Sequence, residues 1–323
     1  MSKGVWTPRA DMPFAVQEIY PTVVTVAGVE MIMNAGGFGA EDSPEPVTAA
    51  TTIYDPTIDS WRRGAPLPTP RHHIALAALQ GAVYAIGGFS ATSEDAAWIM
   101  RADVYRTDDP ITGAWEAAPA LPAPQAEAIC VVVNNRIHMV GGRRVIAEKN
   151  ADWSDHVDTD AHWAFDPATN KWTACAPLPT ARNSAAAAVL NGEIFVVSGR
   201  TVANGNTPVC EAYNPEKDTW RTIAPLPKPV RQKAPHGQGG LAAAARNGKV
   251  YCFGGEWFDD DDGVYADAWE YDPAADAWRA VAAMPRPRHG LGAVNLADGI
   301  YALGGALGPS GDGTSAFVDR FSL

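Results

Sequence analysis

The chain has 323 residues, a formal net charge of −12 at pH 7, and 46% hydrophobic against 19% charged residues. These proportions are ordinary for a soluble globular protein, and the acidic balance provides no basic footprint for nucleic acid. Because the sequence also has no run of about 18 apolar residues, we expect neither a nucleic-acid nor a membrane partner.

The amino-terminal segment and the cysteines bear on location and cofactors. Residues 1–9 lack the apolar core of a secretory signal, so we expect a cytoplasmic protein. The four cysteines form no Cys-x-x-Cys pair, which favours reduced thiols over a disulfide framework or a metal site. We therefore predict neither a metal nor another cofactor. The cysteines are Cys130, Cys175, Cys210 and Cys252.

The first predicted unit shows the outer half of a recurring pattern. An apolar strand ends at the glycine pair 36–37, a variable loop follows, and residues 52–54 form a third strand. Asp55-Pro56 then starts a turn, and a fourth strand carries Trp61. Asp before Pro initiates turns, and Pro is not tolerated in a central strand.

The second unit shows the inner half. Residues 74–79 and 82–86 are short apolar runs joined by Gln80-Gly81, a pair that suits a tight hairpin turn. These features recur six times with a period of about 50 residues, which must be recognised before any fold is assigned. The glycine pairs lie at 36–37, 87–88, 141–142, 198–199 (serine first), 254–255 and 304–305, and the tryptophans are Trp6, Trp61, Trp115, Trp172, Trp220 and Trp278.

Four short strands in each of six units specify a radial array of sheets. The joint pattern of Gly-Gly, aromatic-Asp-Pro and Trp resembles the kelch-repeat family, and the resemblance covers essentially the whole chain. It implies an all-β fold, a six-bladed kelch β-propeller, which we place over residues 1–323 as one domain. The last unit lacks the strand that carries Trp, whereas Trp6 precedes the first unit. We therefore expect residues 4–8 to complete blade six and close the ring.

In such a blade, the loop after strand two and the loop after strand four lie at the same mouth of the central channel. The loops after the glycine pairs are long (38–52, 89–102, 143–162, 200–208, 256–268 and 306–316), and long loops on a rigid scaffold concentrate binding residues. A fixed distance before each glycine pair gives the predicted entry of each innermost strand: Tyr20, Arg71, Gln125, Arg182, Gln238 and Arg288.

We predict that this column binds a ligand, because arginines on alternate blades would approach the channel from three directions and suit a carboxylate or phosphate. The alternative is that each arginine bonds the backbone of a neighbouring loop. The residues after the glycine pairs extend the predicted binding set: Phe38, Phe89, Arg143, Arg200, Glu256 and the adjacent Trp257.

Titratable residues at the same mouth are candidates for acid–base chemistry. His73 and His289 lie near the predicted strand entries of blades two and six, Glu127 lies near that of blade three, and Glu256 follows a glycine pair. A positioned pair of such groups can transfer protons to and from a substrate. We predict these four as the catalytic residues.

The chain further resembles stand-alone bacterial kelch proteins such as the sialic acid mutarotases, whose pocket lies at the channel mouth. This resemblance implies a non-redox enzyme of isomerase, epimerase or lyase type. Its substrate would be a small polar molecule, anionic or sugar-like, anchored by arginines while a glutamate or histidine moves protons.

Two alternatives stay open, because the kelch family includes enzymes, ligand-binding modules and interaction domains. One is a non-catalytic propeller that binds a protein or peptide. The other is a metal-dependent lyase related to the plant specifier proteins, which use iron in a Glu-x-x-x-Asp-x-x-x-His pattern. Glu256 and Asp260 match that pattern, but Val264 replaces the histidine.

Overall fold

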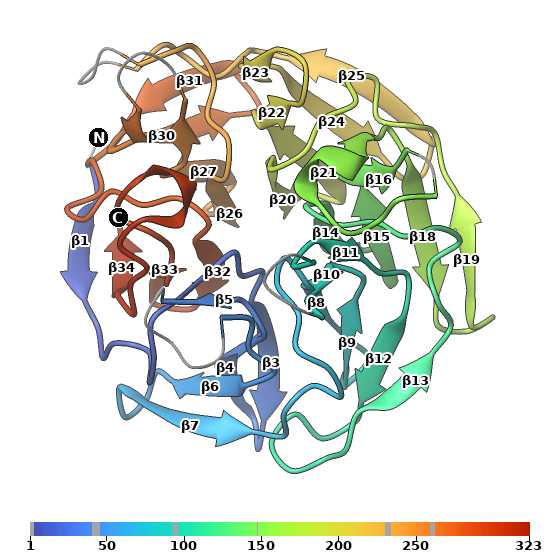
Figure 1. Ribbon diagram of the computed structural model, residues 1–323. Helices are drawn as coiled ribbons and strands as arrows, with labels where there is room; N and C mark the ends of the chain where they lie inside the picture. The colour runs from blue at the N-terminus through green and yellow to red at the C-terminus, as the bar shows by residue number, and fades with distance from the viewer. Residues whose placement is uncertain (1–2, 41–45, 93–95, 147, 230–233, 259–261) are drawn as a thin grey trace.

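The computed structural model describes residues 3–40, 46–92, 96–146, 148–229, 234–258 and 262–323. Six four-stranded antiparallel sheets surround a central axis (Figure 1). From the axis outward, the first three blades are β3 (Thr22–Val26), β4 (Val29–Ala35), β6 (Thr51–Asp55) and β7 (Ser60–Gly64); β8 (Ala75–Leu79), β9 (Ala82–Ile86), β12 (Val104–Thr107) and β13 (Glu116–Ala118); and β14 (Ile129–Val133), β15 (Arg136–Val140), β18 (His162–Asp166) and β19 (Lys171–Ala174).

The other three blades repeat this order. They are β20 (Ala186–Leu190), β21 (Glu193–Val197), β24 (Cys210–Asn214) and β25 (Thr219–Ile223); β26 (Ala242–Arg246), β27 (Lys249–Phe253), β30 (Ala268–Asp272) and β31 (Ala277–Ala280); and β32 (Gly292–Leu296), β33 (Gly299–Leu303), β34 (Val318–Ser322) and β1 (Val5–Pro8). The predicted six-bladed all-β propeller is confirmed.

The amino-terminal strand closes the ring, as predicted. β1 pairs antiparallel with β34, with Val5 opposite Ser322 and Pro8 opposite Asp319. The Trp6 ring packs against Phe321 at a centroid distance of 5.0 Å. The two ends of the chain therefore share one sheet, which removes the open edge that the ring would otherwise present (Figure 1).

The six repeated tryptophans join each blade to the one before it. Each lies in or beside an outermost strand, and its indole N–H donates to a backbone carbonyl in the linker that leaves the preceding blade. The six bonds, 2.8–3.0 Å long, are Trp6 to Ala282, Trp61 to Ala10, Trp115 to Ala65, Trp172 to Pro119, Trp220 to Ala176, and Trp278 to Ala224. The repeat therefore encodes contacts between blades as well as within them.

The glycine pairs mark the point where the second strand turns into the mouth loop. Gly87 and Gly88 both have positive φ, at 58° and 76°. A Cβ on Gly87 would lie 2.4 Å from Gln125 O of the next blade, and one on Gly88 would lie 2.7 Å from His72 O. Neither conformation nor space admits a side chain.

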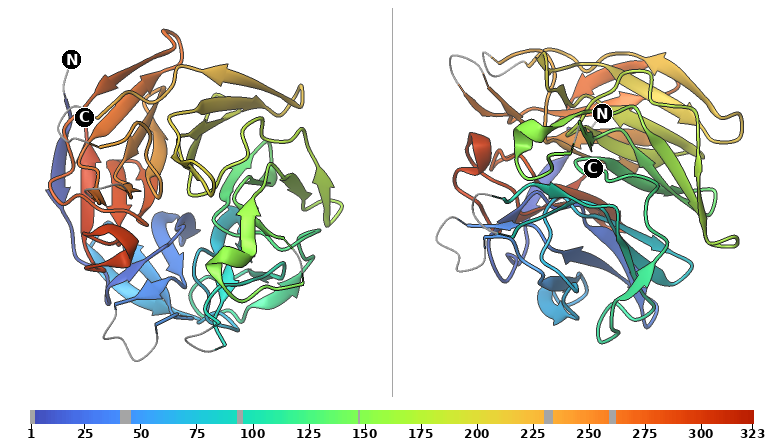
Figure 2. Two further views of the ribbon diagram at one scale, coloured as in Figure 1. Left: turned by 45° about the horizontal axis from the view of Figure 1, so that its top comes forward. Right: turned by 45° about the vertical axis from the view of Figure 1, so that its right-hand side comes forward.

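Short sheets and turns follow the glycine pairs on one face of the ring. Two-stranded sheets pair β2 (Val16–Gln17) with β5 (Phe38–Gly39), β10 (Phe89–Ser90) with β11 (Ile99–Met100), β16 (Arg143–Val145) with β17 (His156–Asp158), β22 (Arg200–Thr201) with β23 (Gly205–Asn206), and β28 (Glu256–Trp257) with β29 (Gly263–Val264). The 3-10 turns η1 (Trp153–Asp155) and η2 (Pro309–Gly311) lie in two of these loops. Figure 2 shows how the mouth loops extend beyond the blades.

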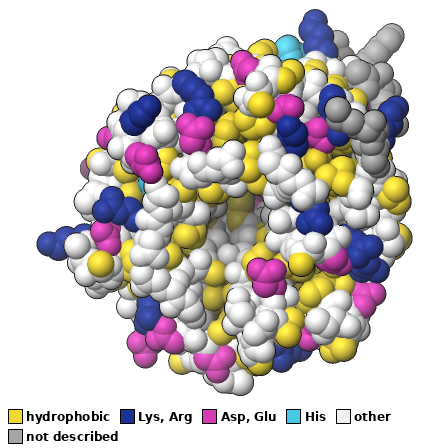
Figure 3. Space-filling view, turned by 180° about the vertical axis from the view of Figure 1, so that it is seen from behind, with side chains coloured by type: hydrophobic (Ala, Val, Ile, Leu, Met, Phe, Trp, Pro, Cys, Tyr) yellow, Lys and Arg dark blue, Asp and Glu magenta, His cyan; other side chains and the backbone are white. Residues whose placement is uncertain are grey.

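The opposite face carries the hairpin turns and has a different character. Its central depression is bordered mainly by hydrophobic and uncharged atoms (Figure 3). The innermost strands line a narrow channel space of about 90 Å³ with residues such as Leu76, Val131 and Leu241. Among the described residues, no helix is long and apolar enough to cross a bilayer.

Candidate functional site

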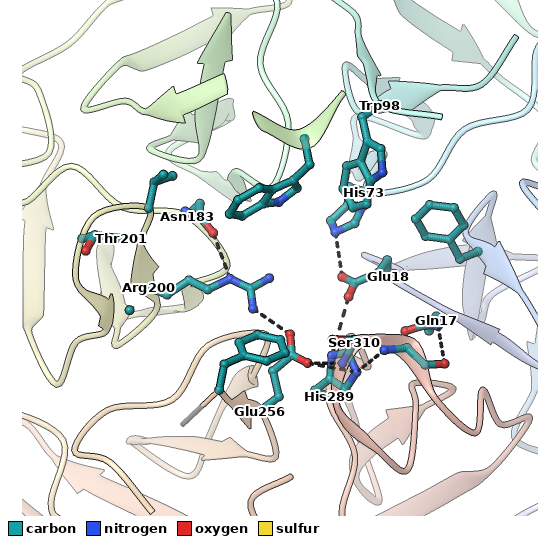
Figure 4. A pocket seen from close by; sticks show the side chains of 16 residues that line it. Gln17, Glu18, His73, Trp98, Asn183, Arg200, Thr201, Glu256, His289 and Ser310 are labelled. Carbon is teal, nitrogen blue, oxygen red and sulfur yellow. Dashed lines mark hydrogen bonds and ion pairs between the residues drawn. The ribbon is translucent and has the colours of Figure 1, made fainter. Parts of the chain in front are cut away.

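A cavity of about 440 Å³ lies at the mouth that carries the small sheets. Aromatic side chains form part of its wall, namely Phe38, Trp98, Trp153 and Phe258. Polar and charged side chains gather at its base (Figure 4): Gln17, Glu18, His73, Asn183, Arg200, Thr201, Glu256, His289 and Ser310. These residues come from most of the blades, so the closed ring is required to assemble the site.

The base of the cavity stands on a collar of six equivalent residues in the left-handed conformation. They are Glu18, His73, Glu127, Ser184, Gly240 and Gly290, with φ between 49° and 68°. Backbone N–H groups in this collar donate to the carbonyl of a neighbouring member, for example Glu18 to Gly290 at 2.7 Å and Gly240 to Ser184 at 2.9 Å. The collar therefore fixes Glu18 and His73 against the channel axis on rigid backbone.

A chain of hydrogen bonds assigns the protons of His73. His72 Nε2 lies 2.8 Å from Ala97 O, so it must be the protonated nitrogen of a neutral ring. His72 Nδ1 then accepts from His73 Nδ1 at 2.7 Å. His73 Nε2 lies 2.8 Å from the Glu18 carboxylate, which requires a second donor. His73 is therefore an imidazolium facing a carboxylate.

This charge arrangement sets the protonation of Glu18. Burial on its own would raise the pKa of the Glu18 carboxyl, but the charge and hydrogen bond of His73, with further contributions from His289 and Arg200, hold the pKa well below its usual range. Burial, followed by the charge of His73, lowers the pKa of His72 well below its usual range. Glu18 is thus an anion at neutral pH, and His72 is a neutral relay.

A second couple lies across the cavity. His289 Nε2 lies 3.3 Å from Glu256 Oε2, and His289 Nδ1 lies 3.7 Å from Glu18 Oε1. The Gly311 N–H also points at His289 Nε2 at 3.3 Å, so this nitrogen lies between a backbone donor and a carboxylate oxygen. Two imidazoles, each beside a carboxylate, thus face the same space.

Arg200 completes the charged base. Its Nη1 lies 2.7 Å from Glu256 Oε1, and its Nε donates to Asn183 Oδ1 at 3.3 Å. Burial opposes the charged form, but the carboxylates of Glu256 and Glu127 outweigh it and raise the pKa of the guanidinium. Figure 4 shows Arg200 and Glu256 converging from neighbouring blades. With Glu18 balanced by His73 and Glu256 by Arg200, the base is close to neutral.

Five residues predicted from the sequence line this cavity: Phe38, His73, Arg200, Glu256 and His289. Three of the four predicted acid–base residues are therefore assembled within one space. Their role in binding or catalysis is a proposal developed below.

The predicted arginine column requires correction, because it faces into the blades. Arg71, Arg182 and Arg288 are buried and do not line the cavity. Each donates to the carbonyl of the first residue of its glycine pair, and Gln125 does the same from Nε2 at 2.6 Å. These side chains therefore bond loop backbone, which was the alternative to ligand binding.

Carboxylates on the third strands neutralise the same arginines. Arg71 pairs with Asp103, Arg182 with Glu211 at 2.5 Å, and Arg288 with Asp319 at 2.7 Å. The charge of each guanidinium is already neutralised by a carboxylate, and each guanidinium donates to a carbonyl inside the blade. These arginines therefore stabilise the turn at the glycine pair, and their charge is not free to bind a ligand. Gln238 occupies the same column and is also buried.

Glu127 and Arg143 belong to the support of the site. Glu127 is fully buried; its Oε1 lies 3.7 Å from Arg143 Nη1, and its Oε2 accepts from Ser184 Oγ at 3.1 Å. Arg143 Nη2 donates to the carbonyls of Trp153 and His156, and its guanidinium lies 3.8 Å from the centre of the Trp153 ring. The pair therefore holds the turn that places Trp153 in the cavity wall.

Three other predicted residues lie outside the cavity. Phe89 is buried behind it and stacks on His72 at 5.2 Å. Trp257 is buried against Tyr265 at 4.7 Å. Tyr20 lies on the channel side below the collar, where burial raises its pKa. None of these three side chains lines the cavity in which they were expected to contact a ligand.

Glu18 and Gln17 were missed because the first blade departs from the register of the others. The β3–β4 hairpin ends at the pair Val26–Val29, and the β8–β9 hairpin of blade two ends at Leu79–Ala82. Counted from the glycine pair of each blade, the first hairpin is longer by two residue pairs. A fixed count back from the glycine pair therefore reaches Tyr20, whereas Gln17 pairs with Phe38 as His72 does with Phe89. Alignment on the buried aliphatic residue after each collar position would have found Glu18.

The specifier-type iron pattern gains no support. Asp260 lies outside the described residues. Glu256 is engaged by Arg200, and Val264 pairs with it across the β28–β29 sheet. The four cysteines are free thiols.

Comparison with known proteins agrees with this architecture. Residues 154–305 match the family described as the KLHDC2/KLHL20/DRC7 Kelch-repeats domain. The chain is a six-bladed propeller built from kelch-type repeats. The kelch-repeat propeller is also similar to the solved structure of YjhT, with a TM-score of 0.76, 15% identity, and coverage of 96% of this chain and 95% of the other. At that identity the likeness shows the fold alone.

Several curated kelch proteins are similar in sequence to this kelch propeller. Kelch-like protein terF of Aspergillus terreus is 27% identical over 87% of this chain and 60% of its own length. Kelch repeat and BTB domain-containing protein 12 of Danio rerio is 29% identical over 66% of this chain and 34% of its own. Human Kelch-like protein 23 is 24% identical over 90% and 46%. The chain spans between a third and three fifths of these relatives.

Proposed function

We propose that the protein binds a small sugar-like molecule in the mouth cavity and catalyses its isomerisation by proton transfer. The observation that carries this proposal is the pair of histidine–carboxylate couples facing one cavity. His73 lies 2.8 Å from the Glu18 carboxylate, and His289 lies 3.3 Å from the Glu256 carboxylate. One proton donor and one proton acceptor are what acid–base catalysis of isomerisation needs.

The charge balance favours a neutral or singly charged ligand. The carboxylates of Glu18 and Glu256 are offset by His73 and Arg200, so the base has no excess positive charge for a polyanion. Arg200 uses Nε and Nη1 within the protein, and among the described residues its Nη2 has no hydrogen-bond partner. That nitrogen is positioned to donate to a ligand hydroxyl or to one carboxylate.

The walls favour a ring-shaped ligand with polar substituents. A volume of about 440 Å³ is within the usual range for small-molecule sites. Trp98 and Trp153 provide flat apolar faces, while the polar groups occupy the base. A sugar has apolar C–H faces and hydroxyl edges, so it can satisfy both parts of such a cavity.

The chemistry is complete with protons alone. In the opening of a cyclic sugar, His73 would donate a proton to the ring oxygen while Glu256 or His289 accepts the proton of the anomeric hydroxyl. Closure on the other face returns both protons and yields the other anomer. The hydrogen bonds from Ala97 O through His72 to His73 hold the His73 ring with its Nε2 directed at Glu18.

The experiment is anomer exchange measured by NMR on a panel of neutral and acidic sugars. The wild-type protein is expected to accelerate exchange of at least one sugar, and Glu18→Gln is expected to slow it by about 100-fold or more. Glu193→Gln, at an exposed ion pair far from the cavity, is the control and should retain the activity. Exchange unaffected by Glu18→Gln, or no acceleration for any sugar, would refute the proposal.

A second candidate is a protein-interaction propeller. The sequence relatives are longer kelch proteins, and the mouth rim exposes apolar residues, including Val202 and Phe258 at 39% and 48% exposure. A peptide crossing the mouth would cover this rim. Selection of a displayed peptide library on the wild type, with Phe258→Asp as counter-selection, distinguishes the two: rim-dependent peptides without sugar turnover support the interaction function.

A further inference from the structure

A second group of ligand-forming atoms lies in blade three, outside the mouth cavity. His138 on β15, His162 on β18 and Cys175 just after β19 place one nitrogen or sulfur atom each within 4.8 Å of one another. His138 Nδ1 lies 2.9 Å from His162 Nε2. Both histidines are buried. Three strands thus bring together residues that are far apart in the sequence.

The His162 ring is already oriented as a metal ligand would be. His162 Nδ1 lies 3.0 Å from Ala176 O, so it carries the proton and leaves the Nε2 lone pair directed at His138. A backbone carbonyl on the far nitrogen is the usual support for a metal-bound imidazole.

The other five blades provide an internal comparison. The position of His162, opposite the residue before the glycine pair, holds small or apolar residues elsewhere: Thr51, Val104, Cys210, Ala268 and Val318. The position of His138, three residues before the pair, holds Met33, Tyr84, Phe195, Tyr251 and Tyr301. Blade packing therefore does not require imidazoles at these positions.

The cysteine position shows the same departure. Cys175 N–H donates to His162 O, and the residues that face the equivalent third-strand position elsewhere are Gly64, Ala118, Ile223, Val281 and Arg9. Blade three alone combines two imidazoles with a thiol. A cavity of about 430 Å³ adjoins the group and is lined by His138, Cys175, Tyr213 and Asp218. A ligand or water can therefore reach the position between the three atoms.

We propose that His138 Nδ1, His162 Nε2 and Cys175 Sγ bind one zinc-type divalent ion, with the fourth position open to this cavity. Two imidazoles and a thiolate suit borderline-soft ions, and zinc–nitrogen bonds of about 2.0–2.1 Å in a tetrahedron place the two nitrogens about 3.3 Å apart. The rings must separate by about 0.4 Å from their hydrogen-bonded distance. Binding releases the thiol proton of Cys175 to solvent as the sulfur–metal bond forms. The proton that His138 Nδ1 donates to His162 is also lost to solvent, while His138 Nε2 takes one up, so that the ring stays neutral and Nδ1 presents its lone pair.

Cobalt serves as the spectroscopic probe, because a thiolate–cobalt bond gives a charge-transfer band in the near ultraviolet. Untagged, chelator-dialysed protein titrated with Co²⁺ is expected to develop this band with one ion per chain, and Zn²⁺ should remove it. Cys175→Ser should abolish the band, whereas Cys130→Ser, a second partly buried cysteine of blade three, should retain it.

A second variant separates the ligand set from the fold. His162→Val introduces the residue type of blades two and six, so the variant should keep its thermal unfolding transition but lose at least 100-fold in Zn²⁺ affinity. Absence of the band in wild-type protein, or a band that survives in Cys175→Ser, overturns the proposal and leaves the two histidines as a hydrogen-bonded pair. Sugar exchange at the mouth is unaffected by either result.

Discussion

The ion pair between Arg200 and Glu256 provides a direct test of whether the mouth is shielded from water. Its Nη1–Oε1 distance is 2.7 Å, and the side chains are 14% and 3% exposed. With charge centres about 4 Å apart and an effective dielectric constant near 20, the attraction is about 4 kcal/mol. Such an environment is what acid–base chemistry at Glu18 and His289 needs, because charges act more strongly where water is excluded.

The perturbation is a double-mutant cycle with Arg200→Met and Glu256→Gln. Each single variant should lower the free energy of unfolding by about 3–5 kcal/mol, since it leaves a buried charge without its partner. The double variant should cost less than the sum of the singles by about 2–4 kcal/mol. For a chain of 323 residues, 4 kcal/mol corresponds to a shift in Tm of about 6 °C.

The exposed pair Arg221–Glu193 is the matched control. Its atoms are 2.6 Å apart, as close as those of the mouth pair, but its side chains are 47% and 23% exposed. Its coupling should be about 0.2–1 kcal/mol. The assay is urea unfolding followed by tryptophan fluorescence at low and high salt. Equal coupling energies for the two pairs would refute the reasoning, because the mouth would then be screened like the surface.

Three further predictions follow from the fold and the site. Trp6→Ala and Trp278→Ala should each lower the unfolding free energy by about 3 kcal/mol, because both indoles pack between blades and bond a linker carbonyl. A much smaller effect of Trp6→Ala in thermal melts would contradict ring closure by β1. Arg182→Gln should lower Tm, because it leaves the buried Glu211 without its cation. The affinity for the sugar, measured by calorimetry, should stay within about twofold of the wild-type value. A large loss of affinity would show that Arg182 contributes to the binding site. The pKa of Glu18 is lower in the folded than in the unfolded protein, so its ionised carboxylate contributes stability above the unfolded carboxyl pKa near 4.3. That stability is lost as pH falls from this value towards the lower folded-state pKa, so Glu18→Gln should flatten acid unfolding below about pH 4. An unchanged profile would mean that Glu18 is not anionic.

Much of the fold follows from local residue requirements. Glycine recurs where the second strand turns past the next blade, as at Gly87, where a Cβ would meet Gln125 O, although Ser198 takes the first position of the pair in blade four. The tryptophans recur because each one bonds the preceding linker. These demands are local and identical in every blade, so the sequence repeats them and the number of blades can be counted.

The candidate site was only partly predictable, for two reasons. First, the longer β3–β4 hairpin shifts the first blade relative to the others, and this hid Glu18, which is central to the charged base. Second, the direction of a side chain depends on partners that are distant in sequence. Arg71 points into its own blade, where it pairs with Asp103. Arg200 points into the cavity, where it pairs with Glu256 of the next blade.

The sequence by itself therefore determined the architecture: six units, a glycine-bounded turn in each, and a ring closed by the strand that carries Trp6. The tertiary structure decided which charged groups face the cavity and which neutralise one another inside the blades. The physical reason is that backbone conformation and packing depend on neighbouring residues along the chain, while the fate of a buried charge depends on its counter-charge, which only the folded ring brings within contact.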